Sequence, residues 1–230
     1  MELTSPLLDL ATERCRANAG AMLNGIVHNL NNPVHALAMQ TELLQNTLRK
    51  DGLDARRSTI QEKCSRLQRI GEELKAQLET LAWRDTYVSP SRQLIDSVHF
   101  GSWLLQFWQS NLLFKHCVSP ALVTEPAPPH LQAIPLALTW CLEEPLKALL
   151  QFNPPQGSQD TIDLVFVLGP ASDSGLMALM TATCSSAQPM VEFGEIDHAR
   201  EIHELTALLG WEWEAVVKPG DLKIRLAIPG

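Results

Sequence analysis

The feature that most constrains the fold of this chain is an apolar stripe with a seven-residue repeat. Its positions are separated alternately by four and three residues, and they are Leu23, Val27, Leu30, Val34, Leu37, Thr41, Leu44 and Leu48. This spacing places the set on one side of an α-helix and is typical of helices that pack along a seam. The preceding run, Leu7 to Ala21, is also compatible with helix. The chain is therefore predicted to begin with a long helix.

A second helix with the same repeat is predicted after a short break. The segment "KDGLD" (50–54) contains a glycine and interrupts the first pattern. The alternation then returns at Ile60, Cys64, Leu67, Gly71, Leu74, Leu78 and Leu81. Two long helices joined by a short turn form an antiparallel hairpin. One hairpin has too little surface to cover two apolar seams, so we expect two copies to form a four-helix bundle, which makes the protein a homodimer. In the alternative, the hairpin packs against the rest of its own chain.

The second part of the chain mixes helix and strand patterns. A linker is predicted at "YVSPSRQ" (87–93), followed by helices over 94–114, 135–152 and 197–209, the last ended by Gly210. A proline-rich loop (125–130) and a turn-rich loop (153–160) flank the middle helix. Short β-like runs at 161–169 and 175–184 predict one antiparallel hairpin, and those at 211–217 and 222–230 predict a second.

These patterns predict an α+β protein with two domains. Residues 1–86 are expected to form the helical hairpin of the dimeric four-helix bundle. Residues 87–230 are expected to form an α/β sandwich, in which helices pack on one face of a mainly antiparallel sheet.

The composition agrees with a globular protein and argues against two classes of partner. Hydrophobic residues make up 45% of the 230 residues, which is enough for a substantial core. The formal net charge is -8, whereas nucleic-acid binding needs a basic face, so no nucleic-acid partner is expected. No apolar run is long enough for a membrane span and the N-terminus does not resemble a signal peptide, so no membrane association is expected. The five cysteines lack C-x-x-C spacing, which favours reduced thiols, a cytoplasmic location and no metal site.

An unusual polar stretch, "GIVHNLNNPVHAL" (25–37), lies within the first predicted helix. Asparagine and proline are poor residues for a helix interior, and Pro33 is expected to bend the helix. Relative to the seam, His28, Asn32 and His35 all fall on the outer side of the helix. His28 and Asn32 are four residues apart, so their Cβ atoms are expected to lie about 5–6 Å apart on one exposed surface.

This stretch resembles the H-box of sensor histidine kinases, in which the histidine accepts a phosphoryl group. Gly25, His28, Asn31, Asn32 and Pro33 match that motif. The resemblance implies that the hairpin is a dimerisation and histidine-phosphotransfer domain. It also implies that the second half is similar to the ATP-binding domain of that family, since the order of elements and the final helix, glycine and hairpin agree.

Several departures from the family pattern argue against kinase activity. The residue after the phospho-accepting histidine is normally an acid that takes part in proton transfer, but here it is Asn29. The predicted helix 135–152 has no asparagine to hold magnesium, and Pro145 lies about where one is expected. The stretch "TATCSSAQP" (181–189) lacks the Asp and Gly of the adenine-binding turn, and no glycine-rich lid follows it. ATP is therefore not expected as a cofactor, and no cofactor is expected on this chain.

The remaining phospho-acceptor face predicts a histidine phosphotransferase of a phosphorelay. His28 would exchange a phosphoryl group with the aspartate of a response-regulator receiver domain, and the magnesium would be held by the receiver. Asn29, Asn31 and Pro33 would support this site. Asn32 also allows a phosphatase that orients a water toward the phospho-aspartate. A third possibility is a non-catalytic scaffold that binds a receiver, and His35 is a competing acceptor.

Overall fold

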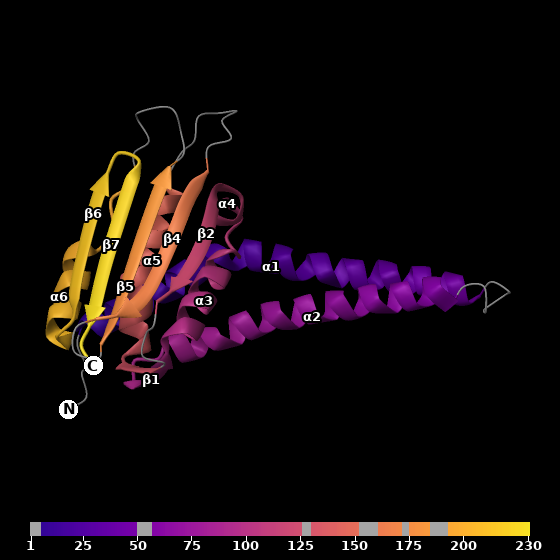
Figure 1. Ribbon diagram of the computed structural model, residues 1–230, viewed down its shortest axis with the longest axis horizontal. Coiled ribbons are helices and arrows are strands. Elements are labelled where there is room, and N and C mark those ends of the chain that lie inside the picture. The colour runs from indigo at the N-terminus through magenta and orange to yellow at the C-terminus, as the bar shows by residue number, and fades with distance from the viewer. Residues whose placement is uncertain (1–5, 50–56, 126–129, 152–160, 172–174, 185–192) are drawn as a thin grey trace. The chain divides into compact units, whose positions relative to one another are not determined.

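The computed structural model describes residues 6–49, 57–125, 130–151, 161–171, 175–184 and 193–230. Two long helices come first, α1 (Pro6–Leu48) and α2 (Arg57–Tyr87), as the repeats predict. The turn predicted at 50–54 lies outside the described residues. The chain forms two compact units (Figure 1). The hairpin unit contains Leu23–Trp83, and the sheet unit contains the residues up to Met22 together with Arg84–Gly230. The start of α1, which the sequence assigned to the helical domain, therefore belongs to the sheet unit.

The sheet unit is built on a five-stranded sheet with the order β2-β4-β5-β7-β6. The strands are β2 (Val118–Thr124), β4 (Ile162–Pro170), β5 (Leu176–Cys184), β6 (Glu212–Lys218) and β7 (Asp221–Ile228). β2 pairs with β4 in parallel, and the other three pairs are antiparallel. The two predicted antiparallel hairpins are therefore confirmed, and so is the α+β fold class.

One face of this sheet carries the core. Every second residue is buried along β4, β5 and β7, and the strand register aligns them, for example Leu164 beside Ala182 and Ala182 beside Leu222. Helices α3 (Ser97–Trp108), α5 (Pro135–Leu150) and α6 (Ala199–Leu209) cover this face (Figure 1). α5 is the central helix and is buried along almost its whole length. Gly210 ends α6 with a φ of 72°, the left-handed conformation that favours glycine at a helix end.

The segment predicted as one helix over 94–114 is instead divided into three elements. It contains the short strand β1 (Gln93–Asp96), then α3, and then α4 (Leu112–Cys117). Two capping side chains explain the division. Asp96 accepts hydrogen bonds from the backbone N–H groups of Val98 and His99 at 3.0 and 2.9 Å, and Asn111 caps α4 in the same way. Each cap starts a new helix and so prevents one continuous helix.

Besides β1, two further strands in this part of the chain were not predicted. β3 (His130–Ala133) pairs antiparallel with β1 in a separate two-stranded sheet. β2 contains Pro120, which argues against a central strand, but β2 lies at the edge of the five-stranded sheet. An edge strand tolerates proline because one side of it needs no ladder hydrogen bond. Among the described residues, no helix is both long and apolar enough to cross a membrane.

Candidate functional site

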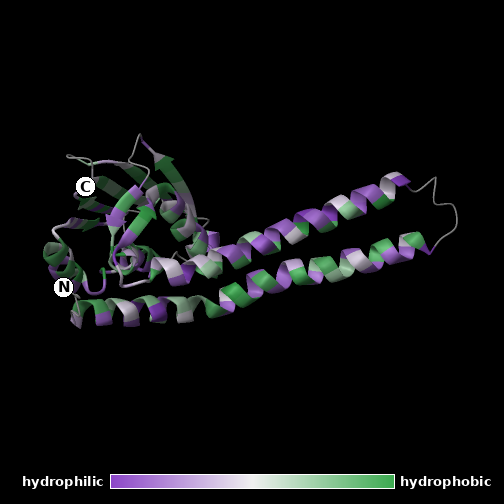
Figure 2. Cartoon of the chain, turned by 90° about the horizontal axis from the view of Figure 1, so that it is seen from below, coloured by the Kyte–Doolittle hydropathy of each residue, from purple (hydrophilic) through white to green (hydrophobic). Residues whose placement is uncertain are grey.

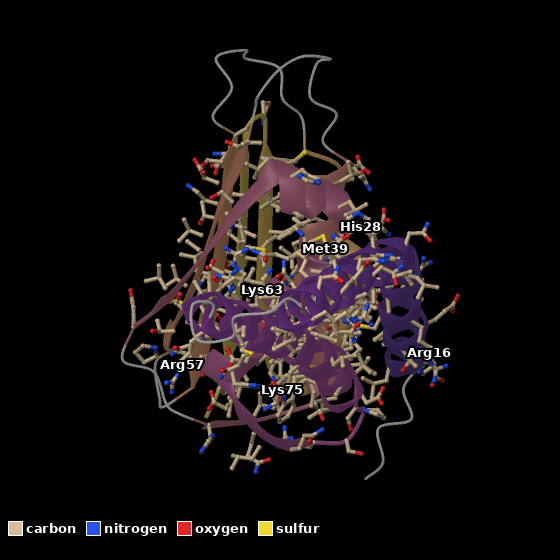
Figure 3. All side chains as sticks on the ribbon, turned by 90° about the vertical axis from the view of Figure 1, so that its right-hand side faces the viewer. Arg16, His28, Met39, Arg57, Lys63 and Lys75 are labelled. Carbon is tan, nitrogen blue, oxygen red and sulfur yellow. The ribbon has the colours of Figure 1, made fainter. Side chains whose placement is uncertain are left out.

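His28 and Asn32 lie one turn apart on the exposed side of α1, within the hairpin unit. Figure 3 labels His28 on this helix. The Nδ2 atom of Asn32 lies 3.5 Å from Nδ1 of His28, which is the limit of a hydrogen bond. The two residues predicted to share a surface therefore meet directly. The amide can act from either end, because its Nδ2 donates and its Oδ1 accepts. Asn32 is thus placed to influence which ring nitrogen of His28 carries the proton.

The other residues of the H-box face different sides of the helix. Asn31 is exposed, whereas Asn29 is half-buried and Pro33 is buried. Asn29 and Pro33 are four residues apart and share the covered side of α1 with Gly25, which is also buried. α1 continues through Pro33 to Leu48, and the bend expected at Pro33 stays a prediction. Asn29 therefore follows His28 in sequence without sharing its exposed surface.

The sequence around His28 offers no acid, since no Asp or Glu occurs between Glu13 and Glu42. Among the ion pairs of the described residues, none joins a carboxylate to this histidine, and the family's acidic position is occupied by Asn29. His35, the competing acceptor, is also exposed, seven residues further along α1. No group of three metal-ligating side chains occurs in the described part of the chain. This surface carries an imidazole beside an amide.

The predicted apolar seam of α1 is largely uncovered in the single chain. The side chains of Leu23, Val27 and Val34 are 58%, 48% and 48% exposed. Apolar residues, green in Figure 2, recur along the helix. On α2, a shallow hollow with an almost entirely apolar lining is formed by Gly71, Leu74, Lys75, Leu78, Glu79 and Ala82. Other residues of α1 are buried within the hairpin unit. Two of them, Pro33 and Gln40, lie one position before a seam residue. The hairpin thus leaves the seam free for a partner.

The resemblance to an ATP-binding domain places the residue that would hold magnesium on α5. Charged side chains of this helix form ion pairs within the chain. Lys147 lies 3.7 Å from the buried carboxylate of Glu144, and its Nζ donates to Asp197 at 2.8 Å. Burial raises the pKa of Glu144, although the ammonium group of Lys147 opposes the shift. The hydrogen bond from Lys147 lowers the pKa of Asp197. Glu144 and Lys147 flank Pro145, so this part of α5 is held to the segment before α6 by charges of the chain itself.

Part of the expected nucleotide region cannot be compared with the prediction. In the stretch "TATCSSAQP", residues 181–184 form the end of β5, and the rest lies outside the described residues. Of the segment that follows, up to Asp197, only residues 193–197 are described. The absence of ATP binding therefore stays a prediction that rests on the sequence.

The sequence analysis missed a second stripe on α1. Leu8, Ala11, Cys15, Asn18 and Met22 are all buried, and their spacing of three and four residues places them on one side of the helix. The spacing of these residues could have revealed the stripe. The polar Asn18 and the small Cys15 hid it, because an apolar stripe is expected to consist of large apolar residues. Also missed were two buried charged residues, Arg84 at the end of α2 and Glu143 on α5, which form an ion pair.

Comparison with known proteins gives structural similarities only. No family model matches the chain, and no curated protein matches it. Among solved structures, it is similar to the histidine kinase AdeS of Acinetobacter baumannii, with 11% identity, a TM-score of 0.44, and coverage of 88% of this chain and 97% of that one. It is also similar to the histidine kinase domain of a blue-light activated histidine kinase from Erythrobacter litoralis, with 14% identity, a TM-score of 0.43, and coverage of 85% and 95%. A third structure, described as a bacterial phosphotransferase, has 14% identity and a TM-score of 0.42, and the match covers 91% of this chain and 95% of that one.

Proposed function

We propose that this protein is a histidine phosphotransferase that exchanges a phosphoryl group between His28 and the aspartate of a response-regulator receiver domain. The observation that carries the proposal is the contact between His28 and Asn32 on an exposed helix face, within a stretch that resembles a phospho-acceptor motif. An exposed nucleophile on a helix can enter the active site of a globular partner. The site lacks a neighbouring acid, which favours transfer from an activated phosphoryl donor over transfer from ATP.

The reaction needs little chemistry from this chain. A neutral ring nitrogen of His28 attacks the phosphorus of the receiver's aspartyl phosphate in line with the P–O bond. The N–P bond forms as the P–O bond breaks, the aspartate carboxylate leaves, and the proton on the other ring nitrogen is released to water. The developing charge on the phosphoryl oxygens would be stabilised by the magnesium of the receiver. The contribution of this protein is to hold the imidazole of His28 in place and accessible to the receiver.

Asn32 supports this step by orienting the ring. When its Oδ1 accepts from the N–H of Nδ1, the lone pair lies on Nε2, which becomes the nucleophile. When its Nδ2 donates to Nδ1, the proton lies on Nε2 and that nitrogen cannot attack. In the structure Nδ2 of Asn32 faces Nδ1 of His28, which is the second arrangement. Turning the amide by half a rotation about its Cβ–Cγ bond gives the first. Asn32→Asp should keep the first arrangement, because an ionised carboxylate only accepts hydrogen bonds. Asn32→Ala should slow transfer by about tenfold, which is less than the loss usually seen when a catalytic acid or base is removed.

The protein is proposed to act as a homodimer. The exposed seam of α1 and the apolar hollow of α2 supply apolar surface that a second hairpin could cover in a four-helix bundle. A two-fold bundle would carry two copies of the His28 face. The sheet unit would not bind ATP, because α5 offers no asparagine and its charged side chains form ion pairs within the chain.

Transfer can be tested with a receiver that carries radiolabelled phosphate on its aspartate. We expect label to move to this protein, in a form that is stable to base and lost in acid, as a phosphohistidine is. His28→Ala should abolish the transfer, whereas the matched variant His35→Ala should keep it. Absence of label on His28 across the receivers of the same organism would reject the proposal.

A response-regulator phosphatase is the second candidate, and the exposed amide of Asn32 favours it. In this function Asn32 would position a water for attack on the aspartyl phosphate, and no phosphohistidine would form. The two functions separate in one experiment. Phosphatase activity should be lost in Asn32→Ala and partly kept in His28→Ala, whereas phosphotransfer shows the reverse order. A receiver that binds but neither loses nor transfers its phosphate would indicate a scaffold.

A further inference from the structure

A buried carboxylate in the sheet unit joins three helices that are far apart in the sequence. Glu143 on α5 has no exposed surface. One of its oxygens accepts from the guanidinium of Arg84 at the end of α2. The other accepts from Arg84 at 3.1 Å and from the amide of Asn18 on α1 at 3.2 Å. Both oxygens are therefore satisfied, as a buried charge requires.

Arg84 adds two further contacts to the same cluster. Its Nη2 donates to the backbone carbonyl of Cys15 at 2.6 Å, so the guanidinium binds α1 as well as α5. Its Cζ atom lies 4.5 Å from the ring centroid of Phe107 on α3, a cation–π distance. Burial and the negative charge of Glu143 raise the pKa of the Cys15 thiol, which keeps it uncharged beside the carboxylate.

The apolar surface around these contacts is limited to one side of α1. The buried stripe of Leu8, Ala11, Cys15, Asn18 and Met22 contains only two large apolar side chains, Leu8 and Met22, and they lie at its two ends. The middle of the stripe is therefore held by polar contacts to Arg84 and Glu143. Buried ion pairs of this kind contribute little net stability, because desolvation offsets their attraction, but they specify one arrangement of the groups they join.

We propose that Glu143 and Arg84 form a clamp that docks the first turns of α1, residues 8–22, onto the sheet unit. The clamp holds together the end of the α1 segment that belongs to this unit and Arg84, the first residue of α2 that belongs to it. It therefore gives the sheet unit a role that needs no nucleotide, which is to hold residues 8–22 of α1 and Arg84 of α2 on α5. This inference is independent of the chemistry proposed at His28.

Amide hydrogen exchange on the full chain tests the clamp. In Glu143→Gln, one carboxylate oxygen is replaced by an NH₂ group that cannot accept from Arg84 or Asn18. Asn18→Leu leaves the ion pair intact and removes the side-chain bond to α1. In each variant we expect exchange in residues 8–22 to become at least tenfold faster, while exchange in β5 and β7 stays unchanged.

The matched control is Glu62→Gln, which removes an exposed ion pair with Arg66 on α2. It should leave the exchange of residues 8–22 unchanged. The proposal is overturned if residues 8–22 exchange at the original rate in both test variants. It is also overturned if exchange accelerates equally in residues 8–22 and in the two strands, because the pair would then support the whole core and dock no segment. Should Glu143→Gln fail to fold, Asn18→Leu decides alone by the same criteria.

Discussion

The exposed face of α1 around His28 and the buried face of α5 hold their polar residues in opposite ways. On α1, His28 contacts one neutral amide and faces outward. On α5, Glu143 and Glu144 are buried and paired with cations of the chain itself. A polar group whose partners are already inside the chain is not free to bind a ligand, whereas an exposed imidazole is. The comparison explains why the proposed transfer is assigned to His28, and why the ion pair of Glu143 is assigned to the core.

The largest expected effect separates a buried charge from an exposed one. Glu143→Ala leaves the guanidinium of Arg84 buried without its carboxylate, so we expect unfolding free energy to fall by about 3–5 kcal/mol. Glu62→Ala removes one partner of a solvent-exposed pair, and its cost should be about 0–1 kcal/mol. Urea denaturation of the two variants measures the difference. Equal losses would show that α5 does not use its charges structurally.

A somewhat smaller effect is expected at the seam of α1. Val27→Glu places a charge on the apolar surface that the proposed dimer buries, so the dissociation constant should rise on the order of 100-fold, or about 3 kcal/mol. Met39→Glu is the matched control, since Met39 is also exposed on α1 but lies off the seam (Figure 3). Analytical ultracentrifugation over a concentration series measures both. If the dimer is equally stable in both variants, the seam of α1 is not the dimer interface.

The smallest effect concerns Glu144, whose pKa burial raises above its usual value near 4.5. The folded state therefore prefers the protonated form. The protonated Glu144 therefore contributes to stability below the pKa that this residue has in the unfolded chain. That contribution is lost as the pH rises through its pKa in the folded protein. Glu144→Gln keeps the shape of the side chain and removes the titration, so its stability relative to the original protein should increase as the pH rises from 4 toward 7. The pKa of Asp197 shifts in the opposite direction, and this residue is present in both proteins.

A flat stability difference between pH 4 and 7 would contradict this assignment. Urea midpoints at several pH values supply the measurement, and Glu204→Gln serves as a control because Glu204 is exposed on α6. The control should show little change with pH in the same window.

The sequence predicted the elements whose signals are local and periodic. Both long helices, α5, α6 and the two antiparallel hairpins follow from repeats of 3.5 or two residues and from glycine at turns. The meeting of His28 with Asn32 was also predictable, since residues four apart on a helix are neighbours. The strands β1 and β3 were missed because each has only four residues, too few for a pattern.

The clamp could not be predicted for a different reason. Arg84 and Glu143 are 59 residues apart, and either one alone reads as an ordinary surface charge. Their pairing depends on how α2 and α5 meet in the fold, which no short stretch of sequence encodes. The buried stripe of α1 was hidden for a related reason, because Asn18 occupies a core position only through its bond to Glu143. Long-range polar contacts of this kind become visible only in three dimensions.

The most direct test of the central claim is to offer His28 two phosphoryl donors in parallel. One reaction contains a receiver labelled on its aspartyl phosphate, and the other contains labelled ATP with magnesium and no receiver. The account predicts label on His28 from the receiver and none from ATP, with both signals absent in His28→Ala. Labelling of His28 by ATP, or its failure to accept from any receiver, would contradict the account.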